Sequence, residues 1–283
     1  QQGESIQRVI ETLNAATKAV PEDAELWLAL GEAYLGENSP TQALPALRNA
    51  RNLLEPTIDG VIEQTCLSRV ALRLGQTLQQ LGHLEGARRE LEQAFMAAPY
   101  QPEVAYAYAK ALLALNDPAP ALLPLEIVLQ SRPSDPQVYL DYARCILDLD
   151  GEINPIQYQR ALIYLGRAME IAPDLPEARA LSAEVLAASG DLLPAMNAYR
   201  KALETRLIED PGWRIRLWLG LGKVALDLGQ IETAVAALQE ASQAGPDNPA
   251  VHRFLCEAYD TVGLTDNAYE SAQTARDLAP NDI

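Results

Sequence analysis

The sequence predicts an all-α protein, an α-solenoid in which about seven and a half helix–turn–helix units stack along residues 1–283. Three observations lead to this fold class. Alanine returns at regular intervals, proline-containing connectors separate the predicted units, and the apolar 48% of the residues includes only two phenylalanines. An apolar content carried by Ala and Leu suits closely packed helices better than sheets.

The regular alanines begin the second helix of each predicted unit. Their spacings are 44, 34, 40, 34, 39 and 34 residues, a period of 34 interrupted by insertions of 10, 6 and 5. A second small residue follows seven positions after each of them, which is two helical turns, so both lie on one helix face. Small residues on one face allow a neighbouring helix to approach closely. The first set is Ala43, Ala87, Ala121, Ala161, Ala195, Ala234 and Ala268.

The connectors between units share one residue pattern, a proline at each end. In Pro99–Pro102, Pro133–Pro136, Pro173–Pro176 and Pro246–Pro249, the first proline ends a helix because it lacks an N–H and clashes with the preceding turn. The second proline suits the first turn of the next helix. Within the units, glycines such as Gly36 and Gly82 are expected to end helices in the left-handed conformation.

Taken in order, the chain begins with a lone second helix at residues 4–20. Seven full units follow at residues 24–56, 57–101, 102–135, 136–175, 176–210, 211–248 and 249–283. The insertions near residues 57–67 and 208–213 are expected to lengthen first helices, the latter with Asp210 as its cap and Pro211 at its start. The insertion near residues 148–155 lengthens a turn before Asn154 and Pro155 restart the chain as a helix. Because neither end has a polar capping helix, we expect the natural chain to continue on at least one side.

A family resemblance supports this architecture. Trp27, Leu30, Gly31 and Tyr34 match the first-helix signature of the tetratricopeptide repeat, Trp-x-x-Leu-Gly-x-x-Tyr, and the Leu-Gly pair returns at Leu74–Gly75 and Leu221–Gly222. The chain therefore resembles the tetratricopeptide repeat (TPR) family over essentially its whole length. The resemblance implies a right-handed superhelix whose concave side is lined by the first helices and receives an extended or helical segment of another protein.

Several classes of function are disfavoured by composition. The formal net charge of −17 disfavours nucleic acid and anionic membranes as partners. No run of about 18 apolar residues is present, so no membrane insertion is expected. Cys66, Cys145 and Cys256 lack a C-x-x-C pattern and are interpreted as small hydrophobic residues in a reducing compartment. We expect a cytoplasmic location, unless a targeting segment has been removed, and the excess of 18 Arg over 4 Lys leans towards a bacterial source.

Catalytic and metal-binding patterns are missing from the sequence. His83 and His252, the two histidines, have no second ligand at metal-binding spacing. There is no nucleophile elbow and no phosphate-binding glycine loop. We therefore expect no cofactor, no metal and no enzymatic activity within these residues.

The predicted binding residues lie on first helices and point away from the Leu-Gly packing face. Cations with apolar residues between them suit a peptide that carries acids or a free carboxylate, because arginine forks match carboxylates. The alternative is that these cations are solvated and pair with Glu103, Asp141 and Asp148. The predicted groove residues are Arg69, Arg73, Gln76, Tyr106, Lys110, Leu140, Arg144, Arg216 and Lys223.

The leading hypothesis is therefore a non-catalytic scaffold that binds a partner protein or peptide. Two alternatives stay open at the level of sequence. The repeats could form the regulatory arm of a larger signalling enzyme, or the chain could self-associate through its terminal repeats. Trp213, inside an insertion, is interpreted as a buried plug rather than an exposed contact for a second partner.

Overall fold

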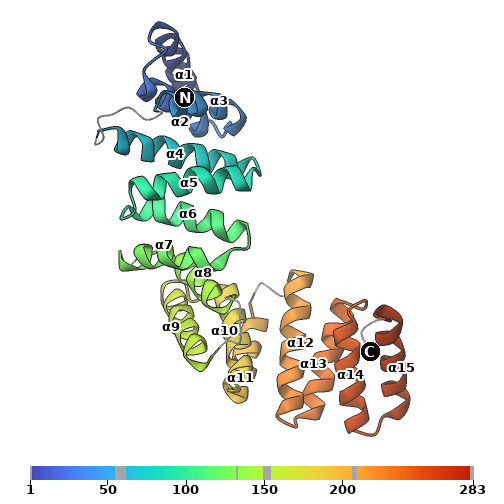
Figure 1. Ribbon diagram of the computed structural model, residues 1–283. Helices are drawn as coiled ribbons and strands as arrows, with labels where there is room; N and C mark the ends of the chain where they lie inside the picture. Colours follow the sequence, from blue (N-terminus) through green and yellow to red (C-terminus); the bar gives the residue numbers. More distant parts are fainter. Residues whose placement is uncertain (1, 55–61, 132, 149–153, 206–208, 281–283) are drawn as a thin grey trace. The chain divides into compact units, whose positions relative to one another are not determined.

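The computed structural model describes residues 2–54, 62–131, 133–148, 154–205 and 209–280 (Figure 1). Within these ranges the chain forms α-helices and no strand. The predicted all-α solenoid is confirmed. The helices are α1 (Gln2–Ala19), α2 (Ala24–Gly36), α3 (Pro40–Leu53), α4 (Ile62–Gln80), α5 (Leu84–Ala97), α6 (Pro102–Ala114), α7 (Pro118–Gln130), α8 (Pro136–Leu147), α9 (Pro155–Ile171), α10 (Pro176–Ala188), α11 (Leu192–Leu203), α12 (Pro211–Asp227), α13 (Ile231–Ala244), α14 (Pro249–Thr261) and α15 (Thr265–Leu278).

The helices divide into two compact units, residues 1–133 with α1–α7 and residues 134–283 with α8–α15. In the first unit, α2 pairs with α3, α4 with α5 and α6 with α7, and α2, α4 and α6 also contact one another in turn. In the second unit, α12 contacts both α10 and α14 in the same manner. First helices therefore share one face in each unit. The repeat boundaries given above, and a single solenoid over residues 1–283, stay predictions.

The alanine pattern forms the core. The seven alanines that begin the second helices are buried, as are the small residues seven positions later. Between them lie large side chains that are also buried, among them Leu47, Leu91 and Leu238. Each of these leucines lies over a glycine of its partner helix: a Cβ added to Gly75 would lie 2.5 Å from Leu91 Cγ. Glycine is needed here because no side chain fits beneath the leucine.

The insertions lengthen helices where the structure describes them. α4 has 19 residues and α12 has 17, against 13 in α2. The part of the first insertion before Ile62 lies outside the described residues, as do residues 149–153 and 206–208. Asn154 forms a full capping box with Gln157 at the start of α9, as its position predicts.

One turn differs from the prediction. Gly82, Gly190, Gly229 and Gly263 have positive φ, as expected for residues that end helices. Gly36 does not, because α2 continues through it and the left-handed residue is Asn38, with φ 56°. Asparagine tolerates this conformation better than most residues, since its short polar side chain bonds locally.

Removing the cap of α12 is expected to cost about 1 kcal/mol of stability. Asp210 accepts a hydrogen bond from the Trp213 amide at 3.0 Å, which satisfies one otherwise free N–H. The measurement is urea unfolding of Asp210→Ala followed by circular dichroism. Asp117→Ala is the matched control, because Asp117 holds the same position before α7 without a side-chain cap bond. Equal losses in the two variants would contradict the assigned role of Asp210.

Candidate binding surface on the first helices

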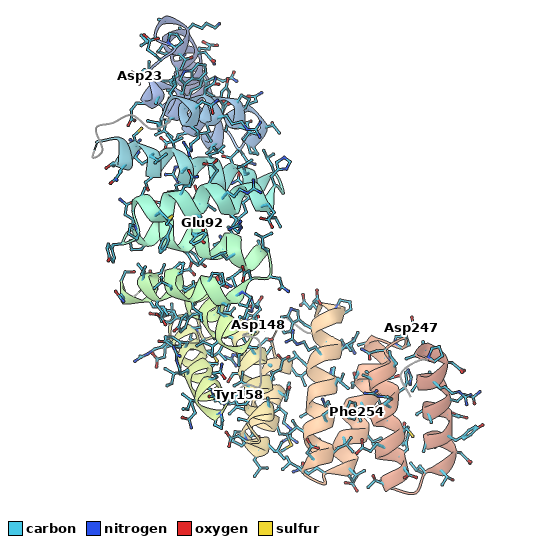
Figure 2. All side chains as sticks on the ribbon, in the orientation of Figure 1. Asp23, Glu92, Asp148, Tyr158, Asp247 and Phe254 are labelled. Carbon is cyan, nitrogen blue, oxygen red and sulfur yellow. The ribbon has the colours of Figure 1, made fainter. Side chains whose placement is uncertain are left out.

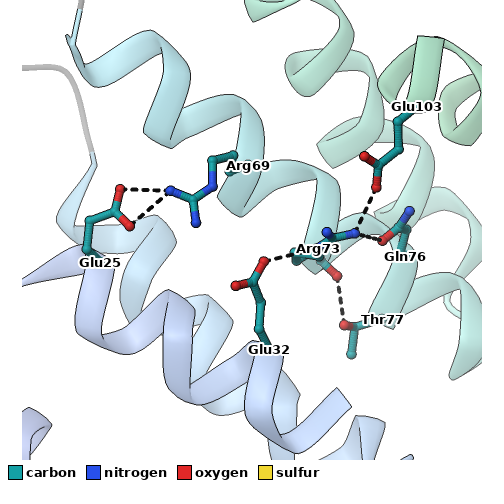
Figure 3. Close-up of polar contacts among 7 residues, drawn as sticks. All are labelled: Glu25, Glu32, Arg69, Arg73, Gln76, Thr77 and Glu103. Atoms are coloured by element: carbon teal, nitrogen blue, oxygen red, sulfur yellow. Dashed lines mark hydrogen bonds and ion pairs between the residues drawn. The ribbon is translucent and has the colours of Figure 1, made fainter. Parts of the chain in front are cut away.

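One arginine links three first helices in the first unit (Figure 3). Arg73, on α4, donates from Nε to Glu32 Oε1 on α2 at 3.1 Å. Its Nη1 donates to Glu103 Oε1 on α6 at 3.0 Å and to Gln76 Oε1 at 3.1 Å. Burial lowers the pKa of Arg73, but the two glutamates raise it by more, so the net shift is upward. The guanidinium is held in place by groups on both sides.

Arg69 forms a second, more exposed ion pair one turn earlier on α4. Its Nη1 lies 3.2 and 3.1 Å from the two carboxylate oxygens of Glu25 on α2. Both side chains are about half exposed, at 50% and 56%. An exposed pair of this kind contributes about 0–1 kcal/mol.

These ion pairs balance the positive charge of the two arginines on this surface of the first unit. Two arginines are matched by three glutamates, so the cluster is not the positive patch that the sequence pattern alone suggests. For Arg73, the structure agrees with the alternative interpretation, since Glu103 is its partner. Sequence reasoning did not identify Glu32 as a partner of Arg73, from which it is separated by 41 positions in the chain.

Tyr106 and Lys110 continue the surface along α6. They are four residues apart and therefore lie on one side of the helix, together with Glu103. The Lys110 ammonium lies 5.5 Å from the centre of the Tyr106 ring, within range of a cation–π interaction. Lys110 is exposed and Tyr106 is half-buried. This part of α6 therefore combines an aromatic ring and a positive charge on one side of the helix.

Leu140 was predicted as an apolar anchor of the groove, and its burial contradicts that role. It is 1% exposed and packs in the core with Ala143 and Leu165. Position 140 faces the neighbouring helices because its side chain fills the space beside small residues of α9 and α10. Arg144, one turn later, is half-buried and forms no ion pair with the described residues. The nearby Asp141 accepts a hydrogen bond from Gln137 Nε2 at 2.8 Å.

In the second unit two of the predicted cations, Arg216 and Lys223, lie over aromatic rings. Arg216, on α12, pairs through two nitrogens with both oxygens of Glu184 on α10, and its guanidinium carbon lies 5.0 Å from the Trp213 ring centre. Lys223 lies 5.1 Å from the ring centre of Phe254, which is labelled in Figure 2. Such stacking holds long cationic side chains in fixed positions.

Trp213 is half-buried and packs against the core of α10, α11 and α12. Its burial lies between that of the buried plug predicted from the sequence and that of the exposed contact, which was the alternative. The ring packs against core residues of these helices, and the Arg216 guanidinium lies over it. The three-residue spacing of Trp213 and Arg216 was the available sequence signal for their contact.

The cysteines are placed as packing residues. Cys145 is buried, and burial raises the pKa of its thiol to about 12. Cys66 is half-buried, and burial together with a hydrogen bond to Glu25 raises the pKa of its thiol to about 11. Both thiols are therefore protonated at neutral pH and are poor nucleophiles.

Two other kinds of site are absent from the described ranges. These ranges contain no group of three or more His, Cys, Asp or Glu side chains that could hold a metal ion. No helix in these ranges combines the length and the apolar character needed to cross a bilayer.

Comparison with protein families finds two matching family models, both described as tetratricopeptide repeat. One matches residues 7–52 and 72–136, and the other matches residues 215–258. Together these matches span more than half of the chain. A search of curated proteins finds no matching sequence.

Solved structures share the fold. The C-terminal part of a TPR repeat-containing protein from Cytophaga hutchinsonii matches with a TM-score of 0.63 and 14% identity, covering 90% of this chain and 96% of that one. PilF of Pseudomonas aeruginosa matches with a TM-score of 0.59 and 17% identity, covering 83% and 97%. PilW, described as a type IV pilus biogenesis factor, matches with a TM-score of 0.56 and 18% identity, covering 82% and 98%. At these identities the similarity establishes the fold alone.

Proposed function

The chain belongs to the tetratricopeptide repeat family, and from that premise we propose that it is a non-catalytic scaffold that binds a segment of a partner protein. The binding surface is the face formed by α2, α4 and α6, which we name the first-helix face. The observation that carries the proposal is the set of contacts around Arg73, which keeps polar side chains of three helices in register on one surface. Preorganised side chains bind with less loss of conformational entropy.

The chemistry of this face favours a partner segment that presents a carboxylate. Arg69 is held by Glu25 in an exposed pair, so an incoming carboxylate can take the place of Glu25 and keep the arginine fork satisfied. Tyr106 and Lys110 supply an aromatic surface and a second cation on the neighbouring helix. The carboxylate can come from an acidic side chain or from a chain terminus.

The test is affinity capture from the native organism, followed by titration of the captured partner with variants of the full chain. Arg69→Glu with Arg73→Glu is expected to weaken binding by at least about tenfold, because it replaces two cations by anions beside Glu25, Glu32 and Glu103. The control is Arg167→Glu with Arg276→Glu, which makes the same charge change at arginines of the second helices α9 and α15. Equal affinities of the two double variants would overturn the proposal.

A second double variant tests the same surface without changing Arg73, whose contacts connect three helices. Arg69→Gln with Lys110→Gln alters only exposed side chains and leaves the contacts of Arg73 intact. We expect its circular dichroism to match that of the unaltered chain, while its affinity for the partner falls by about three- to tenfold. Unchanged affinity would remove Arg69 and Lys110 from the binding surface.

A further inference from the structure

A pocket of about 440 Å³ lies between α3 and α5 in the first compact unit. Its base is apolar, formed by Leu74 and Leu78 of α4, which are 3% and 7% exposed. Its polar walls come from the two second helices on either side. We name it the α3–α5 pocket. It is built from other residues than the first-helix face, so it is independent of the function proposed above.

The walls of this pocket concentrate positive charge. Arg48 and Arg51 lie three residues apart on one side of α3, and Arg89 projects from α5. Glu90 is the one acidic residue among those that line the pocket. Three arginines against one glutamate give a local excess of positive charge in a chain whose formal net charge is −17.

The three arginines are not equivalent. Arg51 donates from Nε to Glu90 Oε2 at 3.2 Å, and its Nη2 donates to Gln93, so this guanidinium connects α3 to α5. Arg48 and Arg89 are exposed and form no ion pair with any described residue. Glu90 is therefore already paired with Arg51, and the guanidinium groups of Arg48 and Arg89 stay available to a ligand.

We propose that the α3–α5 pocket binds a phosphate group, carried either by a small phosphate ester or by a phosphorylated side chain. Planar guanidinium groups on facing helices match the oxygens of a phosphate and form charge-assisted hydrogen bonds with them. A compact dianion is favoured over an extended polyanion. An extended polyanion would meet the rest of a chain whose formal net charge is −17. A compact ligand would not, because charges more than about 8 Å away are screened at physiological ionic strength.

The position of His83 allows ligand binding to the α3–α5 pocket to be followed by NMR. It lines the pocket at the N-terminal end of α5, and the only other histidine, His252, lies on α14 in the second unit. Inorganic phosphate is titrated into the full chain at constant ionic strength, with sodium chloride as the balancing salt, and the two imidazole resonances are followed by NMR. We expect the His83 signal to shift saturably while the His252 signal stays in place.

Neighbouring arginines on α5 supply a matched pair of variants. Arg89→Gln is expected to weaken phosphate binding by about tenfold or more, and Arg48→Gln to act in the same way. Arg88→Gln makes the same change in charge one residue away, at an arginine that pairs with Glu85 and Glu92 outside the pocket, and should bind nearly as tightly as the unaltered chain. Circular dichroism of each variant reports whether the helices are intact.

Two further ligands distinguish the sources of the phosphate. Free phosphoserine and a phosphoserine peptide are compared with the same peptide lacking the phosphate. Tighter binding of the phosphopeptide supports a modified partner side chain, and equal binding of the two phosphorylated ligands supports a small ester. Absence of a saturable His83 shift with every phosphorylated ligand, or equal weakening by Arg88→Gln and Arg89→Gln, would overturn the proposal.

Discussion

Leu91→Ala is expected to lower the free energy of unfolding by about 3–4 kcal/mol, the largest effect among the variants considered. Leu91 is 0% exposed, and its side chain lies directly over Gly75 of the partner helix. Truncation leaves a cavity that the glycine has no side chain to fill. Urea unfolding followed by circular dichroism measures the loss, and hydrogen exchange of the α4 and α5 peptides locates it.

Two comparisons sharpen this prediction. Leu123→Ala removes an equal volume from an exposed leucine of α7 (60% exposed) and should cost less than about 0.5 kcal/mol. Gly75→Ala should destabilise the unaltered chain by about 1–2 kcal/mol, because its Cβ would lie 2.5 Å from Leu91 Cγ. In the Leu91→Ala background the same change should cost less, because the clash with Leu91 is gone and alanine favours the helix, while a contact of 3.2 Å to the Ala87 carbonyl oxygen remains. An equal loss of stability in both backgrounds would contradict the packing of Leu91 over Gly75.

Gly220→Ala is expected to destabilise the second unit by about 2–3 kcal/mol. A Cβ at this position would lie 2.4 Å from Cζ and 2.5 Å from Cε1 of Tyr199. The ring is 4% exposed, and burial, followed by the charge of Glu184, raises the pKa of its hydroxyl. A rigid buried ring cannot move aside as a flexible side chain does, so the added methyl group must displace α11 or α12. Thermal and urea unfolding measure the loss.

Gly166→Ala is the matched control for this variant. Gly166 lies inside α9 of the same unit, and a Cβ there would meet nothing within 4 Å. Replacing glycine by alanine inside a helix is then favourable by about 0.5–1 kcal/mol. The two substitutions are chemically identical, so their difference isolates the clash with Tyr199. A Gly220→Ala variant as stable as Gly166→Ala would contradict it.

The fold was predictable because its determinants repeat. A small residue that returns with a period of 34 identifies the buried face of each second helix, and the paired prolines mark where helices end and begin. Caps such as Asp210 and Asn154 follow from residue type and position alone. The sequence did not predict that Asn38, rather than Gly36, would be the left-handed residue, since both residue types suit that role.

The proposed binding surface and the α3–α5 pocket were less predictable, because their contacts join helices that are distant in sequence. Arg73 meets Glu32 across 41 positions, and Arg51 meets Glu90 across 39. Periodicity identifies the side of one helix but not the rotation of that helix relative to its neighbours. Leu140 shows the same limit, because its predicted exposure depended on how α8 turns towards α9 and α10.

The packing of a leucine over a glycine has a consequence for the design of chimeras between the repeat units of this protein. In three helix pairs a leucine lies over a glycine of the same pair: Leu47 over Gly31, Leu91 over Gly75 and Leu238 over Gly222. Ala109, Ala143 and Ala183 stand at the corresponding place in other pairs. Chimeras should therefore exchange whole helix pairs, so that each leucine stays with the glycine it packs against. Exchanging single helices would instead place the methyl group of an alanine beneath a leucine that packs against a glycine in this chain.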